Sequence, residues 1–319
     1  MIIEREYMAN LGKMNKLFLV FDSKLYFYDF CSTETCHCKQ VFRHNKILFK
    51  IAHILKKVLG FVPPFFWDGW KKQISNYDVI VITDYIYFPY LFKYIKKHNK
   101  NAKVFFYYMN EIDTIKQKYL RIEELQKYFK DGIYTYNNTD ALENIIFYKP
   151  TMYTKYNNLN YTLQKKNRDF IFWGRDKGRS KSIISFYEQL KDIYTFNIRI
   201  LGGKGIFSTK KFISYKDYLQ DMIECETIIE ITSHSSQSVS LRIMEALFYN
   251  KKIITNNIGI IQLPIYEEIK KNVLFVDFEH PNMDQIKLFQ QKEIEKIDEK
   301  TICKYEFSEW MKSFTGKAE

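Results

Sequence analysis

One segment in the second half of the chain constrains the fold more than any other. Residues 227–233 (TIIEITS) read as a buried strand, and residues 238–257 read as a polar loop, a short helix and a second buried strand. A strand, a helix and a further strand form one unit of an open α/β sheet, which binds ligands beyond the carboxyl ends of its strands. The helix begins at that edge, where its free backbone N–H groups attract phosphate.

Two charged residues on this predicted helix are candidates for ligand contact. Arg242 and Glu245 are three positions apart and so share one face of the helix. Together they suit a phosphate and a ribose hydroxyl. The alternative is an exposed ion pair on an ordinary surface helix, which contributes little to stability.

The length and composition of the chain indicate a two-domain globular protein. Its 319 residues exceed what one hydrophobic core usually serves, and 46% of them are hydrophobic. The longest apolar run is far shorter than the ~20 residues that span a bilayer. The first residues, MIIEREY, lack the charged start and continuous apolar core of a signal peptide. We therefore expect a cytoplasmic protein, soluble or peripheral to a membrane.

The net charge of +12 suggests an anionic partner: nucleic acid, an acidic membrane or a phosphorylated substrate. An AT-rich genome would also give this abundance of Lys, Asn, Ile, Phe and Tyr, so charge is informative only where it clusters. Among the five cysteines, Cys36 and Cys38 flank His37 without the spacing of a zinc site. We expect free thiols and no structural metal.

Apolar strands alternate with amphipathic helices in both halves, which predicts mainly parallel, doubly covered sheets. A polar run over 150–168 interrupts the alternation and reads as a connection. We predict domains at 1–155 and 156–319, with the amphipathic segment 305–314 packing back across the domains. The predicted strands are 16–21, 78–83, 102–108, 132–136, 169–173, 198–201, 227–233 and 272–277, and the predicted helices are 42–59, 86–98, 118–129, 180–191 and 215–224.

A basic glycine turn, GRDKGR at 174–179, lies between the first strand and first helix of the second half. Gly174 lets backbone approach a ligand closely, because glycine has no Cβ. Arg175, Lys177 and Arg179 bring three cations to this turn, and Arg suits bidentate phosphate recognition. The turn matches neither Walker A nor GxGxxG. In this position anion binding is favoured over a solvated loop.

A second glycine turn, GGKG at 202–205, follows another strand on the same side. Gly203 is a candidate for close approach of a nucleotide base or phosphate. A plain turn explains the glycines almost as well.

These segments together resemble bacterial glycosyltransferases with two Rossmann-like domains facing a cleft (GT-B), most closely those of lipopolysaccharide and capsule biosynthesis. The resemblance rests on GRDKGR, a following Tyr-x-x-Tyr-Leu, the segment QSVSLRIMEALFYNKKIITNN, and residues 131–141 at the end of the first half. It covers about 130–280 well. It implies transfer of a sugar from a nucleotide-sugar donor to a growing surface glycan, with a glycan or lipid-linked acceptor.

By this resemblance the second domain binds the donor and the first binds the acceptor. Many retaining relatives have a glutamate eight residues before the ribose-binding one, where this chain has Gln237, so the stereochemical outcome stays open. The sequence has no Asp-x-Asp motif, which would suggest a divalent metal ion. Fixed Arg and Lys side chains could stabilise the leaving group in place of such an ion. We expect no metal and no other cofactor. The donor contacts that the resemblance implies are Arg175, Lys177, Arg179, Ser240, Arg242 and Glu245, and the two glycine turns add Gly174 and Gly203 to the candidate donor site.

The acceptor hydroxyl needs a base, which carboxylates at strand ends of the first half could supply. Asp22 and Glu111 are our candidates, with Asp84 and Asp113 as further ones, and each has an alternative role as a helix cap or solvated carboxylate. His234, in the polar loop, could hydrogen-bond the sugar or phosphate or simply lie at the surface.

The predicted helix over 42–59 carries an apolar stripe and a basic face, with aromatic residues 65–70 close behind. This pattern is compatible with contact to an anionic membrane, at the inner face of the cytoplasmic membrane. The favoured alternative is that the stripe faces the sheet.

Two other classes of protein remain open. A nucleic-acid-binding protein fits the charge, although no helix-turn-helix, zinc-finger or RNP signature occurs. An epimerase-like or non-transferring relative would bind a nucleotide sugar without transferring it.

Overall fold

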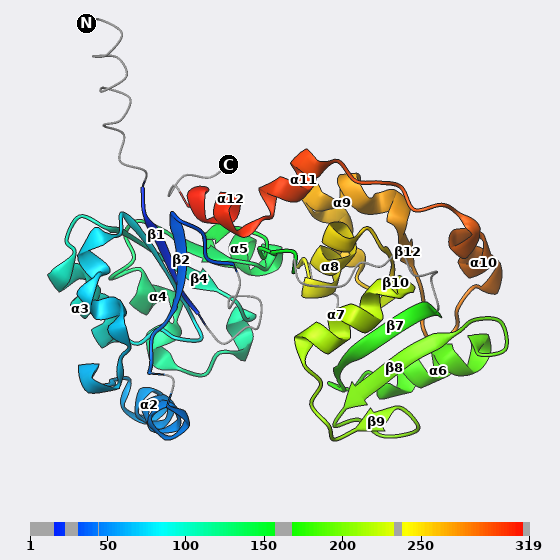
Figure 1. Ribbon diagram of the computed structural model, residues 1–319, viewed down its shortest axis with the longest axis horizontal. Coiled ribbons are helices and arrows are strands. Elements are labelled where there is room, and N and C mark those ends of the chain that lie inside the picture. Colours follow the sequence, from blue (N-terminus) through cyan, green and yellow to red (C-terminus); the bar gives the residue numbers. More distant parts are fainter. Residues whose placement is uncertain (1–15, 23–30, 44, 157–167, 233–237, 315–319) are drawn as a thin grey trace, which may run out of the picture. The chain divides into compact units, whose positions relative to one another are not determined.

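The computed structural model describes residues 16–22, 31–43, 45–156, 168–232 and 238–314. The chain divides into two compact units (Figure 1). Unit 1 comprises residues 1–135, 140–148 and 307–319, and unit 2 comprises residues 136–139 and 149–306. The C-terminal helix α12 (Phe307–Lys312) therefore belongs to unit 1, where Trp310 packs edge-on against Tyr107 with 5.0 Å between ring centroids.

Unit 1 is built on a parallel six-stranded sheet with the order β2-β1-β3-β4-β5-β6. All five residues of β3 are buried, as is typical of strands covered on both faces. The strands are β1 (Phe18–Asp22), β2 (Cys36–Gln40), β3 (Val79–Thr83), β4 (Lys103–Tyr108), β5 (Ile133–Thr135) and β6 (Phe147–Tyr148). The other helices are α2 (Lys46–Leu59), α3 (Pro89–His98), α4 (Ile122–Leu125) and α5 (Asn138–Asn144), and the first two residues of α5 belong to unit 2.

Unit 2 repeats this architecture with the order β12-β11-β10-β7-β8-β9, again all parallel. Because β7 comes first in the unit, the strand order reverses between β7 and β10, the position at which open α/β sheets bind ligands. The elements are β7 (Arg168–Arg175), α6 (Ser180–Leu190), β8 (Phe196–Leu201), β9 (Ser208–Thr209), α7 (Tyr215–Ile223), β10 (Cys225–Glu230), α8 (Leu241–Tyr249), β11 (Lys252–Thr255), α9 (Pro264–Ile269), β12 (Val273–Phe275), α10 (Met283–Gln291) and α11 (Glu299–Lys304).

Local signals explain where two helices begin and end. The side chain of Asn45 accepts hydrogen bonds from the first turn of α2, and Gly60 ends that helix in the left-handed conformation. Ser240 caps α8 in the same way, and Asn250 ends it at a φ of 54°. Capping therefore fixes the start of α8 at the carboxyl edge of the sheet in unit 2.

The α/β class and the two parallel sheets confirm the fold predicted from the sequence. The strand β2 was not predicted. Within the helix predicted over 118–129, the structure has the 3-10 helix Lys118–Leu120 and the short helix α4. The sequence favoured a helix over 42–59 whose apolar stripe faces the sheet, and this prediction is wrong for several apolar residues that are exposed. Helix α2 buries Ala52 and Lys56, whereas Ile47 and Val58 remain about 70% exposed, at 69% and 73%.

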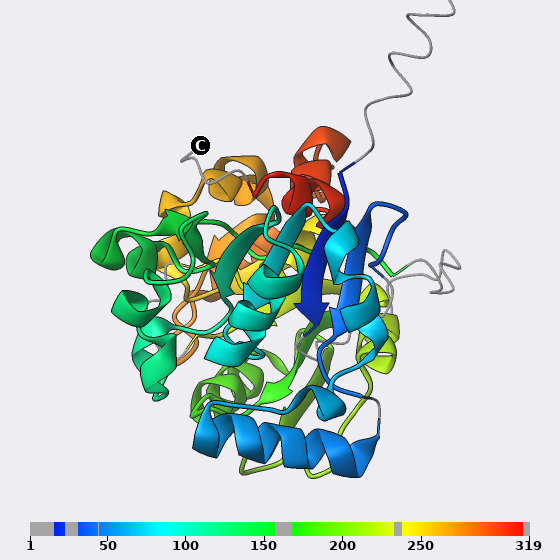
Figure 2. The ribbon, with the colours of Figure 1, turned by 90° about the vertical axis from the view of Figure 1, so that its left-hand side faces the viewer.

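Helix α2 lies along the carboxyl-terminal edge of the sheet of unit 1 (Figures 1 and 2). None of the helices within the described ranges combines the length and apolar character that crossing a bilayer requires.

Candidate functional site

The basic turn after β7 places Arg179 at the point where the strand order of unit 2 reverses. Arg179 immediately precedes α6, and its guanidinium donates hydrogen bonds to three carbonyl oxygens. The Nη1–oxygen distance to Ile231, just beyond β10, is 3.0 Å, and the other two acceptors are in the turn itself, at Arg175 and Asp176. Arg179 thus connects the ends of the two strands that flank the reversal.

Arg242 reaches the same place from the first turn of α8. Its Nη2 donates a 2.6 Å hydrogen bond to the carbonyl oxygen of Trp173, in β7. Its guanidinium carbon lies 4.9 Å from the ring centroid of Phe172, and that of Arg179 lies 5.2 Å from the same centroid. Burial, and then the positive charge of Arg242, lowers the pKa of Arg179 to about 10. Two guanidinium groups are therefore held together despite their mutual repulsion.

Gly174 provides the space for this arginine pair. A β-carbon at this position would lie 2.6 Å from Nη2 of Arg242 and 3.4 Å from Nη2 of Arg179. Gly203 is also required by packing, because a β-carbon there would lie 2.4 Å from Cγ2 of Ile200 and 2.7 Å from the Ser180 hydroxyl. Both predicted glycines therefore allow other groups to approach the backbone closely, and in this structure those groups are side chains of the protein itself.

The other predicted donor-site residues lie in the same turn or at the start of α8. Arg175 ends β7 and Lys177 has a φ of 46°, and both are exposed. The hydroxyl of Ser240 accepts a hydrogen bond from the backbone N–H of Ile243 and so caps α8. The structure therefore brings the turn at 174–179 and the start of α8 to one edge.

Glu230, which sequence reasoning missed, ends β10 beside the arginine pair and is 1% exposed. Its Oε2 accepts a 2.6 Å hydrogen bond from the hydroxyl of Thr255, at the end of β11. Burial raises the pKa of Glu230, while the positive charges of Arg242 and Arg179 act in the opposite direction. A glutamate inside the apolar run TIIEIT was the signal that could have identified it.

Arg242 contacts β7, whereas the side chain of Glu245 contacts α7. Its carboxylate is buried, and it accepts hydrogen bonds of 2.8 Å from the hydroxyl of Tyr215 and 2.6 Å from that of Tyr218. The hydroxyl of Tyr153 lies 2.7 Å from that of Tyr215. Burial raises the pKa of Glu245 to about 7, and the tyrosine hydroxyls and Arg242 oppose this rise. The proposed ribose contact of Glu245 stays a prediction, and in this arrangement the two tyrosines already engage the carboxylate.

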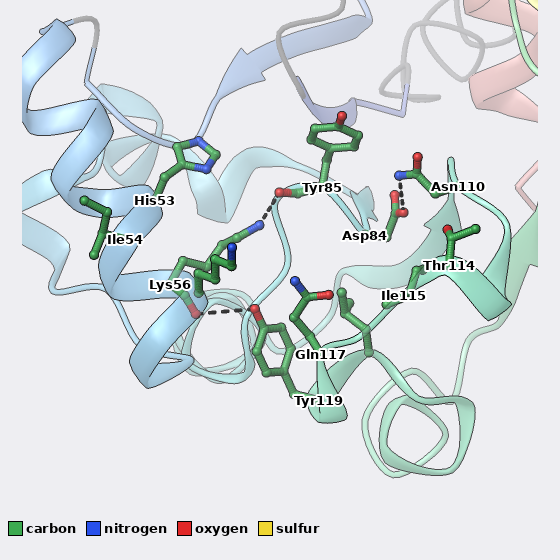
Figure 3. Close-up of a pocket in the computed structure, with 12 residues that line it drawn as sticks. His53, Ile54, Lys56, Asp84, Tyr85, Asn110, Thr114, Ile115, Gln117 and Tyr119 are labelled. Atoms are coloured by element: carbon green, nitrogen blue, oxygen red, sulfur yellow. Dashed lines mark hydrogen bonds between the residues drawn. The ribbon is translucent and has the colours of Figure 1, made fainter. Parts of the chain in front are cut away.

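Unit 1 has a pocket of about 480 Å³ at the carboxyl edge of its sheet. It is bounded by α2, by the end of β3 and by the segment after β4 (Figure 3). Its polar lining includes Asp84, Tyr85, Asn110, Thr114, Gln117 and Tyr119, and its basic lining includes Lys56 and Lys57.

Asp84 supplies a buried carboxyl group to the lining of this pocket. Its Oδ1 accepts a 3.1 Å hydrogen bond from the backbone N–H of Met109, and its Oδ2 accepts a 2.7 Å bond from Nδ2 of Asn110. Lys56 donates to the carbonyl oxygen of Tyr85. Burial lowers the pKa of Lys56 to about 8, although the negative charge of Asp84 opposes this change.

The two preferred base candidates come from different segments of unit 1. Asp22 is the last residue of β1, and the residues that follow it lie outside the described ranges. Glu111 precedes the short 3-10 helix Ile112–Thr114, is half-buried and is not among the residues that line the pocket. His234 and Gln237 lie outside the described residues. In the described part of the chain, no three His, Cys, Asp or Glu side chains are grouped to hold a metal ion.

No model of a known protein family matches the chain, and no curated protein matches it. Solved structures similar to it include the lipopolysaccharide outer core galactosyltransferase WaaB in its apo form, with 15% identity, a TM-score of 0.43 and coverage of 94% of this chain and 98% of that one. Apo OtsA shares 10% identity, with a TM-score of 0.49 and the same two coverages. An α1,3-fucosyltransferase with GDP shares 11% identity, with a TM-score of 0.38 over 93% of this chain and 83% of that one.

Proposed function

We propose that this protein is a glycosyltransferase that binds a nucleotide-sugar donor on unit 2 and its acceptor on unit 1. The observation that carries the proposal is the pair of guanidinium groups of Arg179 and Arg242 at the strand-order reversal between β7 and β10. Open α/β sheets bind their ligands at this position.

A diphosphate is the ligand that best fits this pair. Arg179 and Arg242 repel one another, and an anion beside them would relieve that repulsion. Guanidinium groups suit phosphate oxygens because they donate two parallel hydrogen bonds. Arg175 and Lys177 add exposed positive charge in the same turn, and α8 begins at this edge with its positive dipole end.

The same residues suit the chemistry of glycosyl transfer. When the bond between the anomeric carbon and the diphosphate breaks, negative charge builds on the leaving group. Fixed guanidinium groups stabilise this charge without reorganising during the reaction. We propose that they do so independently of a metal ion.

The pocket of unit 1 is the proposed acceptor site. Its amide, hydroxyl and carboxylate groups match the hydroxyl groups of a sugar, and Tyr85 is half exposed at its edge, with 50% of its surface accessible. Asp84 positions Asn110 here, whereas Glu111 and Asp22 remain candidates for the base that receives the acceptor proton. We propose an acceptor glycan of surface-polysaccharide assembly, such as lipopolysaccharide or capsule.

Hydrolysis and transfer with a panel of UDP-, GDP-, CMP- and dTDP-sugars test the proposal. We expect the wild-type protein to release one nucleotide, and Arg242→Gln to lose at least tenfold in rate because a leaving-group contact is gone. Arg168→Gln is the matched control, because Arg168 is an exposed arginine at the opposite end of β7.

Absence of hydrolysis and transfer for every donor would contradict the proposal. Nucleotide-sugar binding without either reaction would indicate the non-transferring relative. Salt-sensitive binding of random DNA or RNA, with no nucleotide-sugar binding, would indicate the nucleic-acid-binding class.

A further inference from the structure

Helix α2 exposes an apolar stripe on the surface of unit 1. Ile47, Ile51, Ile54 and Val58 are spaced at positions i, i+4, i+7 and i+11, so they lie along one face of the helix. Their exposed fractions are 69%, 40%, 61% and 73%. At the end of the helix and in the segment after it, Leu59, Phe61 and Phe65 are exposed as well. We call these seven residues the α2 stripe.

Positive charge surrounds the α2 stripe. Helix α2 exposes Lys46, Lys50 and Lys57, buries Lys56 and has no acidic residue. The guanidinium carbon of Arg43 lies 5.0 Å from the ring centroid of Phe65. Lys71 donates a 2.7 Å hydrogen bond from Nζ to the carbonyl oxygen of Pro64; burial and the positive charge of Arg43 lower its pKa, and the carboxylate of Asp68 opposes this change.

This combination matches an anionic bilayer better than another protein surface. Interfacial helices present an apolar face to the acyl boundary and lysines to the headgroups, and the α2 stripe is flanked in this way. We propose that the α2 stripe and its flanking cations bind unit 1 to the surface of an anionic membrane. A lipid that carries a phosphate or carboxylate headgroup is the partner that complements both the apolar and the basic groups.

The pocket of unit 1 adjoins this surface. Ile54 belongs to the α2 stripe and also lines the pocket, as does the neighbouring Lys57. A bilayer that receives the α2 stripe would therefore bring its headgroups beside the pocket, which suits an acceptor anchored in the membrane. The membrane-anchored acceptor rests on the proposed function, whereas the membrane contact itself does not.

Vesicle flotation tests the membrane contact directly. We expect the wild-type protein to float with vesicles of phosphatidylglycerol and phosphatidylethanolamine, and to stay unbound with pure phosphatidylcholine. Binding should weaken at about 1 M NaCl, where the Debye length is about 3 Å.

Variants separate the apolar from the electrostatic contribution. Ile47→Glu/Val58→Glu should lower vesicle affinity at least tenfold, whereas Leu142→Glu, at a site 71% exposed elsewhere in unit 1, should leave it unchanged. Lys46→Glu/Lys50→Glu should lower it similarly, with the exposed Lys100→Glu/Lys103→Glu as control. Thermal unfolding confirms that each variant folds.

Wild-type protein that stays unbound at low salt would overturn the proposal, as would full binding by Ile47→Glu/Val58→Glu. A wild-type dimer that becomes a monomer in that variant, without vesicle binding, would identify the α2 stripe as an interface between copies of the chain. Failure of vesicle binding leaves the donor assay of unit 2 unaffected, so the two proposals fail independently.

Discussion

Gly174 and Arg242 are so close that a β-carbon on residue 174 would lie 2.6 Å from Nη2 of the arginine. Strand β7 therefore has a glycine one residue before its end, where α8 brings in its arginine, although 68 positions separate the two residues (242 − 174). The hydrogen bond from Arg242 to the carbonyl oxygen of Trp173 fixes the guanidinium at this position.

Gly174→Ala should weaken nucleotide binding without unfolding the protein. The new methyl group would displace the flexible end of Arg242 and so disturb the arginine pair. We expect an affinity loss of about tenfold, equivalent to about 1.4 kcal/mol, measured by isothermal titration calorimetry. Gly69→Ala is the control, because a β-carbon there has no atom within 4 Å. Equal losses in both variants, or no loss in Gly174→Ala, would argue against the role of the pair.

Glu245 should make stability fall as the pH rises. Its pKa is raised from the ordinary 4.5 to about 7, so the folded state binds a proton that the unfolded state has lost between these values. The stabilisation is complete below about pH 4.5 and is lost as the pH rises through about 7. Urea unfolding of wild type and Glu245→Gln should show that their difference in unfolding free energy changes by roughly 2 kcal/mol between pH 5 and pH 8.

Tyr218→Phe removes a hydroxyl group that donates a hydrogen bond to Glu245, and so tests the same titration. The hydroxyl of Tyr218 lowers the pKa of Glu245, so its removal should raise that pKa further and extend the pH-dependent range upward. Identical pH profiles for wild type, Tyr218→Phe and Glu245→Gln would show that Glu245 does not titrate in this range.

Lys56 should titrate well below an ordinary lysine. Burial lowers its pKa to about 8, and the carboxylate of Asp84 moderates this effect. We expect the Cε signal of Lys56 in ¹³C-lysine-labelled protein to have its midpoint near this value, with Lys56→Arg for assignment. Asp84→Asn should lower the midpoint further, because the stabilising negative charge is removed. A wild-type midpoint near 10.5 would contradict the buried position of the lysine in the pocket wall.

The buried strands could be predicted because their signal is local. Runs such as DVIVIT at 78–83 and AKVFFYY at 102–108 became β3 and β4 with boundaries shifted by one residue at most. The edge strand β2, with the sequence CHCKQ, has no continuous apolar run and was missed. Its pairing with β1 is a tertiary interaction that periodicity does not report.

The candidate sites were predictable only in part. The basic turn and the start of α8 could be placed at one edge because parallel strands end together. Arg242 and Glu245 share a helix face, yet one bonds to β7 and the other to α7, because each side chain follows its tertiary partners. The pocket of unit 1 combines α2 with segments about 30 and 60 residues away, such as Asp84 and Gln117, and no local pattern joins them.

Isothermal titration calorimetry measures directly whether Arg179 and Arg242 contribute to nucleotide binding. UDP, GDP, CMP and dTDP should be titrated into the wild-type protein and into Arg242→Gln, Arg179→Gln and the control Arg168→Gln. We predict that one nucleotide binds to wild type and to Arg168→Gln, and that its affinity falls about tenfold to a hundredfold in the other two, the range expected for a lost charged hydrogen bond. Binding that is unchanged in Arg242→Gln and Arg179→Gln, or no binding of any nucleotide to the folded wild-type protein, would contradict the account.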